Sequence, residues 1–108
     1  MSKEFLGEFE EIILTMVAAL GDDAYGAAIT DEIELRLKRS VKLSAVHVTL
    51  YRLQDKGFLK SHMGGGTNER GGRRKRIYTV TDAGMATLQE LKEKRLLLWG
   101  MVPQLKIS

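Results

Sequence analysis

The sequence predicts a mainly α-helical fold that carries one small β-hairpin. Apolar residues recur at spacings of three and four in four separate segments, the pattern of amphipathic helices. Residues 77–81 are rich in β-branched and aromatic side chains and indicate a short strand. Residues 58–63 alternate apolar and polar side chains less cleanly, as an edge strand does. We therefore expect the two strands to pair across the segment between them.

Two helices are predicted in the first third of the chain. The first ends near residues 21–23, and its wide apolar stripe comprises Phe5, Phe9, Ile12, Ile13, Met16, Val17 and Leu20. The second spans residues 24–38. Asp22 or Asp23 is expected to cap it, because a short carboxylate accepts hydrogen bonds from the unpaired amides of a first turn.

A third helix is predicted over residues 45–56, extended by Leu43 and ended by Gly57. Its buried stripe is Val46, Leu50 and Leu53. The side chains predicted to face away are Ser44, Ala45, His47, Val48, Thr49, Tyr51, Arg52, Gln54 and Lys56. Small and polar groups beside cations suit a helix in a DNA major groove, with Arg52 or Lys56 near phosphates. An ordinary amphipathic helix is the alternative.

Residues 70–76 hold five cations in seven positions, separated by three residues from the glycines at positions 64–66. These cations are Arg70, Arg73, Arg74, Lys75 and Arg76. A cluster this dense on a loop favours a polyanion such as the phosphodiester backbone. A solubilising surface loop is the alternative.

The net charge of +3 conceals an asymmetry along the chain. Residues 1–34 carry nine acids and one base, whereas residues 35–76 carry twelve bases and two acids. Such polarisation suits a protein that orients on a polyanion, and internal pairing between helices would also account for it.

The last helix is predicted from a Thr81 cap to about Gly100, and its apolar positions include Leu88, Leu91 and Leu96. Residues 96–99 are apolar on every side, more than a surface helix of a small monomer can easily cover. We therefore predict a homodimer built on this helix and the first helix, with Phe5 and Phe9 at the interface. Trp99 fits either a stacking wall for a flat hydrophobic effector or simple interface filling.

Several classes of protein are disfavoured by composition. The chain has no cysteine, and neither histidine has a second ligand at helical spacing, so no metal site or other cofactor is expected. No nucleophile, base and orienting acid form a recognisable catalytic set, so an enzyme is not expected. No window has the apolar length of a membrane span and no secretory signal is evident, which makes the cytoplasm the expected compartment.

The order helix, helix, helix, strand, basic loop, strand, helix is that of a winged helix-turn-helix with an added dimerisation helix. Residues 1–80 would form the DNA-binding winged helix and residues 81–108 the dimerisation helix and tail, in one structural domain overall.

Five segments of the sequence resemble the PadR-like transcriptional regulators. They are LGEFE (6–10), AYG (24–26), LYRLQDKGFL (50–59), GRRKRIY (72–78) and TDAG (81–84). Each segment is weak evidence alone. The combination of the Tyr25-Gly26 pair, the basic wing and the 81–84 turn is specific.

The resemblance implies a DNA-binding repressor, dimeric through its carboxy-terminal helix, which in many members a small apolar or aromatic effector releases from the operator. It places the recognition helix at residues 44–56 and the wing cations at Arg73, Arg74 and Lys75. The short last helix is similar to that of the small-member branch. Family members commonly have a tyrosine where this chain has His47. A contact of that phenol with phosphate or a base has no direct equivalent here, although the His47 imidazole could still donate to a phosphate.

The function predicted from the sequence is a dimeric, sequence-specific transcriptional repressor on an inverted-repeat operator in double-stranded DNA. Two alternatives remain open. One is a winged-helix module that binds a partner protein through its apolar last helix and acidic first helix. The other is non-specific binding of RNA or chromosomal DNA, against which the scarcity of aromatic residues for base stacking counts.

Overall fold

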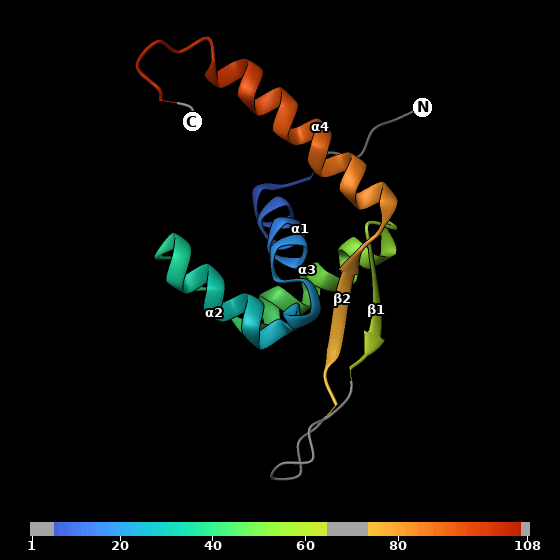
Figure 1. Cartoon of the computed structure of the whole chain (residues 1–108). Coiled ribbons are helices and arrows are strands. Elements are labelled where there is room, and N and C mark those ends of the chain that lie inside the picture. The colour runs from blue at the N-terminus through green and yellow to red at the C-terminus, as the bar shows by residue number, and fades with distance from the viewer. Residues whose placement is uncertain (1–5, 65–73, 107–108) are drawn as a thin grey trace.

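The computed structural model describes residues 6–64 and 74–106. Its elements are α1 (Glu8–Leu20), a 3-10 helix (Gly21–Asp23), α2 (Gly26–Leu37), α3 (Leu43–Asp55), β1 (Leu59–Met63), β2 (Arg76–Val80) and α4 (Asp82–Trp99). Helices α1 to α3 gather beside the hairpin, and α4 leaves the upper end of β2 (Figure 1). The predicted fold class, mainly helical with one hairpin, is confirmed.

The core lies where the first three helices meet the inner face of the hairpin. Its buried apolar residues are Ile13, Leu14, Val17, Ala24, Ile29, Ile33, Val46, Leu50, Leu53, Leu59 and Tyr78. The three residues predicted as the buried stripe of α3, Val46, Leu50 and Leu53, are therefore all buried. Leu14 was missing from the predicted stripe of α1, whereas Phe9, Ile12, Met16 and Leu20 are only partly buried at its margin.

The predicted cap of α2 is wrong. Asp22 and Asp23 belong to the 3-10 helix, and the residue before α2 is Tyr25, whose side chain makes no capping hydrogen bond. The intervening Ala24 is buried, and its carbonyl accepts a 2.9 Å hydrogen bond from the Tyr78 amide of β2. This tertiary contact holds the chain extended for two residues, so α2 begins later than its apolar pattern indicates.

The carboxy-terminal end of α3 agrees with the prediction. Gly57 has φ +84°, a left-handed conformation that a glycine adopts without steric penalty. The Phe58 amide donates back to the Leu53 carbonyl at 3.0 Å, which closes the helix and turns the chain into β1.

Strands β1 and β2 pair antiparallel, with Leu59 opposite Val80 and Ser61 opposite Tyr78. Both predicted strands are present within one residue at each end. The tip that joins them, residues 65–73, lies outside the described residues.

The start of α4 is locked onto the hairpin by Thr81 and Gly84. The Thr81 hydroxyl donates to the Gly57 carbonyl at 2.7 Å and accepts from the Gly84 amide at 3.1 Å, which confirms the predicted cap. A β-carbon on Gly84 would lie 2.4 Å from the Phe58 carbonyl oxygen. Only glycine at position 84 lets α4 approach the Phe58 carbonyl this closely, which explains the glycine in the 81–84 turn.

Among residues 6–64 and 74–106, no single helix is long and apolar enough to span a membrane. Only α1 with its 3-10 extension and α2 meet the length and composition criteria, as a pair bent by 119°.

Candidate nucleic-acid interface

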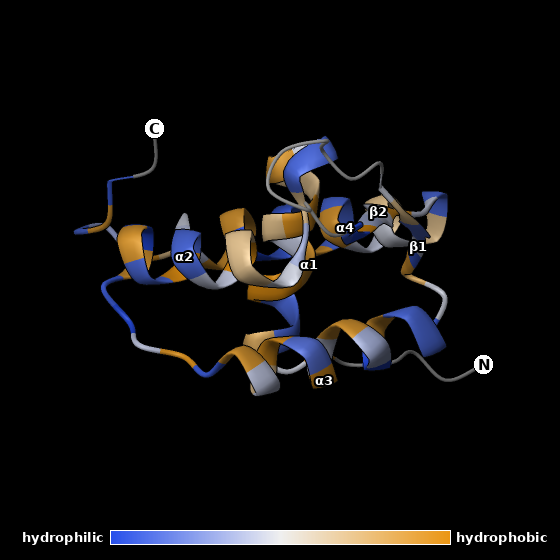
Figure 2. Ribbon diagram, turned by 90° about the horizontal axis from the view of Figure 1, so that it is seen from below, coloured by the Kyte–Doolittle hydropathy of each residue, from blue (hydrophilic) through white to orange (hydrophobic). Residues whose placement is uncertain are grey.

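The outward face of α3 is the first part of the candidate interface. Figure 2 shows that hydrophilic and hydrophobic residues alternate along this helix. Five of the predicted contact residues are exposed there: Ser44, Ala45, Val48, Tyr51 and Arg52. Their side chains face away from the core, as predicted.

Thr49 corrects that prediction. Its side chain is only 5% exposed, so it does not face outward. The buried face of α3 is wider than the predicted stripe, because this helix packs against α1, α2 and β1. A residue that adjoins the stripe, such as Thr49, is then covered as well.

His47 is also less open than predicted. Its imidazole is partly buried over the first turn of α2, where a β-carbon on Gly26 would lie 2.6 Å from the ring's Cε1. Its Nδ1 is buried and has no hydrogen-bond partner within the part of the chain described. The ring stacks with Tyr51 at 6.4 Å between centroids. Gly26 therefore lets α3 approach α2 closely, which accounts for the glycine of the Tyr25-Gly26 pair.

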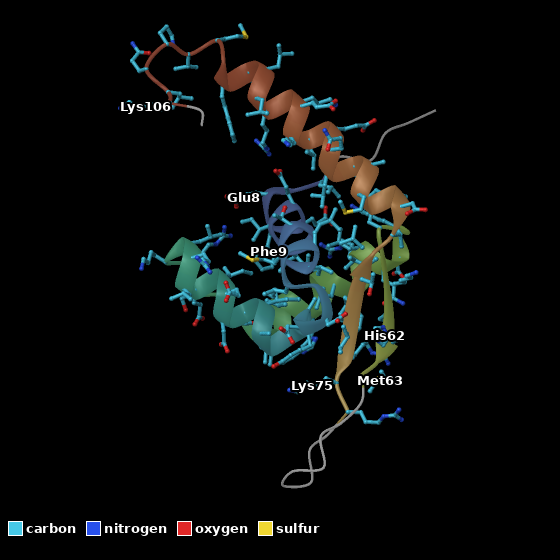
Figure 3. All side chains as sticks on the ribbon, in the orientation of Figure 1. Glu8, Phe9, His62, Met63, Lys75 and Lys106 are labelled. Atoms are coloured by element: carbon cyan, nitrogen blue, oxygen red, sulfur yellow. The ribbon has the colours of Figure 1, made fainter. Side chains whose placement is uncertain are left out.

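The wing contributes cations beside this surface. Lys75 Nζ lies 4.2 Å from the ring centroid of Tyr25, and Figure 3 places Lys75 just before β2. Arg74 is exposed next to it. The predicted contacts Arg70 and Arg73 lie outside the described residues. Tyr25 thus joins the wing to the start of α2, a role that sequence reasoning missed although Tyr25 was part of the motif.

A polar chain connects the wing to α3. Arg76 Nη1 donates to the Ser61 hydroxyl at 3.1 Å, and this hydroxyl donates to Gln54 Oε1 at 3.3 Å. One residue from each of β2, β1 and α3 takes part. Arg76 was recognised in the basic run but not as a site residue. No local signal identifies Ser61 or Gln54, because their contact depends on the pairing of distant segments.

Lys56 does not join the outward face. Its ammonium lies 3.2 and 3.1 Å from the two carboxylate oxygens of Glu10, which also accepts from the Gly7 amide at 3.0 Å. Glu10 is buried, and the pair ties the start of α1 to the end of α3. Of the two cations expected near phosphates, Arg52 is therefore the exposed one, whereas Lys56 is paired with Glu10.

Tyr78 lies beneath the interface. Burial raises the pKa of its phenol above the ordinary value, and Tyr51 adds to this increase, while Arg76 opposes it. Its hydroxyl has no hydrogen-bond partner within residues 6–64 and 74–106.

A second site is a hollow of about 570 Å³ between α1, the end of α2 and α4. Its lining comprises Glu8, Glu11, Ile12, Thr15, Met16, Leu37, Arg39, Arg95 and Trp99. Arg95 donates to both carboxylate oxygens of Glu11, which raises the pKa of Arg95 and joins α4 to α1. Arg39 pairs with Glu8 at 3.1 Å and lies over the Phe9 ring.

The second half of α4 projects beyond the body of the molecule (Figure 1). Leu97 is 71% exposed, Leu98 59% and Trp99 43%. Leu96 is exposed as well, whereas Leu88 and Leu91 nearer the body are partly buried. Of the predicted effector or dimer residues, only Trp99 lines the hollow, and Phe5 lies outside the described residues.

Across the described ranges, no three histidine, aspartate or glutamate side chains are placed to hold a metal ion.

Three helices followed by a two-stranded wing define a winged-helix protein, with α2 and α3 as the helix-turn-helix. The chain belongs to the PadR-like family of transcriptional regulators, whose family model matches residues 13–90. None of the curated proteins has a significantly similar sequence.

Solved structures of that family share the fold. A PadR family transcription regulator from hypervirulent Clostridium difficile superposes with a TM-score of 0.71 at 25% identity, covering 91% of this chain and 97% of its own. A PadR-like transcriptional regulator from Bacillus cereus gives 0.67 at 22% identity, over 88% and 84% of the two chains. Bacillus subtilis PadR in complex with operator DNA gives 0.62 at 24% identity, over 93% of this chain and 50% of that one.

Proposed function

We propose that this protein is a sequence-specific DNA-binding transcriptional repressor that acts as a homodimer in the cytoplasm. The observation that carries the proposal is the polar chain from Arg76 through Ser61 to Gln54, because it holds a basic wing beside the exposed face of α3. A helix reads base edges in the major groove, while cations on a neighbouring element neutralise phosphates.

In this proposal Ser44, Ala45, Val48, Tyr51 and Arg52 face the groove, and His47 lies at its margin. Arg74 and Lys75 contact flanking phosphates, together with Arg70 and Arg73 of the loop. Thr49 and Lys56 take no part, because one is buried and the other is paired with Glu10.

The homodimer is proposed to form through α4 and α1. The exposed leucines of α4 would be covered by a second copy, and residues 1–80 and 81–108 would then divide DNA binding from dimerisation. A two-fold dimer requires half-sites about one helical turn, or roughly 34–36 Å, apart or at a multiple of that distance.

We also propose that a small hydrophobic or aromatic effector binds the hollow beside Trp99. The apolar side chains of Ile12, Met16 and Leu37 would surround it, while the Glu11–Arg95 pair forms a polar rim. Occupation of a hollow walled by both α1 and α4 would change the angle between them, and thereby the spacing of the two recognition helices.

Selection of bound duplexes from a random DNA pool, at near-physiological salt with competitor DNA, tests the proposal. The expected result is an enriched inverted repeat that the purified protein protects as a dimer. Protection of a single asymmetric site by a monomer would contradict the architecture. Binding only at low salt without enrichment would contradict sequence-specific recognition, and would favour a protein partner on the apolar end of α4.

A further inference from the structure

The centre of the outward face of α3 is apolar. Val48 is 52% exposed and Tyr51 54% exposed, although neither lies in the first or last turn of α3. Isolated exposed apolar side chains are common on protein surfaces. These two differ because they lie on the helix that the Arg76–Ser61–Gln54 chain joins to the wing.

The neighbours of Val48 on the helix surface are short on one side and long on the other. Ser44 and Ala45 precede it by four and three residues, which places them beside it one turn earlier. Their small side chains let the first half of α3 approach the floor of a groove. Tyr51 and Arg52 follow at the next turn.

The distribution of charge along α3 also favours insertion of its first half into the groove. The exposed Asp55 ends α3, and its carboxylate is repelled by phosphates. The amino-terminal half of α3 carries no acid, since the exposed residues from Lys42 to Val48 are cationic, hydroxylic or apolar. The first half of the helix is therefore expected to enter deepest. It has two exposed branched apolar side chains, Leu43 and Val48. Val48 shares a face with Ser44 and Ala45, whereas Leu43, five residues earlier, lies about 140° around the helix from Val48.

Resting on the proposed function, we propose that Val48, supported by the methyl group of Ala45, recognises the 5-methyl group of a thymine in each half-site. That methyl is the one apolar group a base presents in the major groove. An isopropyl side chain forms no hydrogen bond, so a polar base edge placed against it loses water without gaining a partner. Val48 is therefore a specificity-determining residue for thymine at one position.

The test uses the full-length protein and the inverted repeat that it selects from a random pool. In a series of duplexes, one thymine at a time is replaced by deoxyuridine, which removes only the methyl group. The series covers every thymine of both half-sites. One thymine per half-site is expected to show a loss of affinity of about fourfold, the effect of one buried methyl group. In Val48→Ala and Val48→Ser this sensitivity disappears at that position alone, while the salt dependence of binding stays unchanged.

Leu35→Ala is the matched control, because Leu35 is also an exposed apolar residue but lies on α2. It is expected to keep the deoxyuridine profile of the natural protein. Since Val48 is exposed, its variants should have the melting temperature of the natural protein. Thermal unfolding of the same preparations measures this.

The outcomes separate the two proposals. A flat deoxyuridine profile, or an unchanged profile in both Val48 variants, overturns the thymine assignment while the selected repeat upholds the regulator. If no duplex is enriched, the proposed function fails and this inference fails with it.

Discussion

Two glycines permit close approaches of different kinds. At Gly26 the neighbour of an added β-carbon is the His47 imidazole, whereas at Gly84 it is the backbone carbonyl of Phe58. The His47 side chain can move or be removed by substitution, whereas the hydrogen-bonded backbone at Phe58 can do neither. The two positions therefore respond differently to the same substitution.

Gly26→Ala is expected to destabilise the protein by about 1–3 kcal/mol, the usual effect of an added methylene in a packed region. In the His47→Ala background, Gly26→Ala should cause no loss of stability or a small gain, since alanine is favoured over glycine within helices. Chemical denaturation of the four proteins of this cycle measures both effects. An undiminished loss in the double variant would show that the ring is not the obstacle.

Gly84→Ala is expected to destabilise by at least as much, because its β-carbon would lie 2.4 Å from a carbonyl oxygen. His47→Ala provides no rescue here, which makes it a control for the Gly26 cycle. Equal stability of Gly84→Ala and the natural protein would mean that α4 is free to shift on the hairpin.

The buried phenol of Tyr78 gives a prediction about alkaline stability. Its pKa is about 10 in the unfolded chain and is raised by burial in the folded protein. Below pH 10 the phenol keeps its proton in both the folded and the unfolded protein, so its contribution to the free energy of unfolding is complete. As pH rises above 10 the unfolded chain loses its proton first, and stability falls until the folded pKa is passed.

Tyr78→Phe is therefore expected to lose less stability than the natural protein between pH 9 and pH 11. At pH 7 the two should differ by less than about 1 kcal/mol, because no hydrogen bond of this hydroxyl is present among the described residues. Urea denaturation over this pH range measures the difference. Parallel curves for the two proteins would contradict the prediction.

At the scale of elements, the basic residues of α3 and of the wing have separate roles. Lys56 joins α3 to α1 through Glu10, whereas Arg74 is exposed beside β2. Lys56→Met is expected to lower the free energy of unfolding by about 1–3 kcal/mol, because the buried carboxylate loses its cation. It should leave the salt dependence of DNA binding unchanged.

Arg74→Ala is the matched comparison. It should leave stability within about 0.5 kcal/mol of the natural value and reduce the salt slope of binding by about one per half-site. Chemical denaturation of the two variants, and salt titration of their binding to the selected duplex, distinguish Lys56→Met from Arg74→Ala. A reduced slope in Lys56→Met would show that this lysine leaves Glu10 to contact phosphate.

For the molecule as a whole, we propose that the exposed end of α4 determines the oligomeric state. Leu97 and Leu98 point into solvent in one chain, and a contiguous apolar surface of this kind marks an interaction site. The double variant Leu97→Glu with Leu98→Glu is expected to sediment at half the natural mass at micromolar concentration. Its affinity for the selected repeat should fall at least tenfold, since the two recognition helices would no longer bind together.

Lys94→Glu is the control for added negative charge on the same helix, because Lys94 is exposed. It should remain dimeric. A natural protein that sediments as a monomer would overturn the proposed dimer before any variant is compared.

The sequence alone determined the elements and their order. Apolar periodicity located all four helices, Val46, Leu50 and Leu53 appeared as the buried stripe, and Gly57 and Thr81 marked two helix ends. Such signals are local, since each depends on residues within one or two turns. The family resemblance was likewise confirmed from motifs in the printed chain.

Tertiary structure decided which side chains remain available for function. Thr49 is covered because α3 packs against α1, α2 and β1, and Lys56 is paired with a glutamate 46 residues earlier. Ala24 delays α2 by accepting a hydrogen bond from a strand formed much later in the chain. Periodicity indicates which face of a helix is buried, but the width of that face and the partner of each charge depend on packing between distant segments.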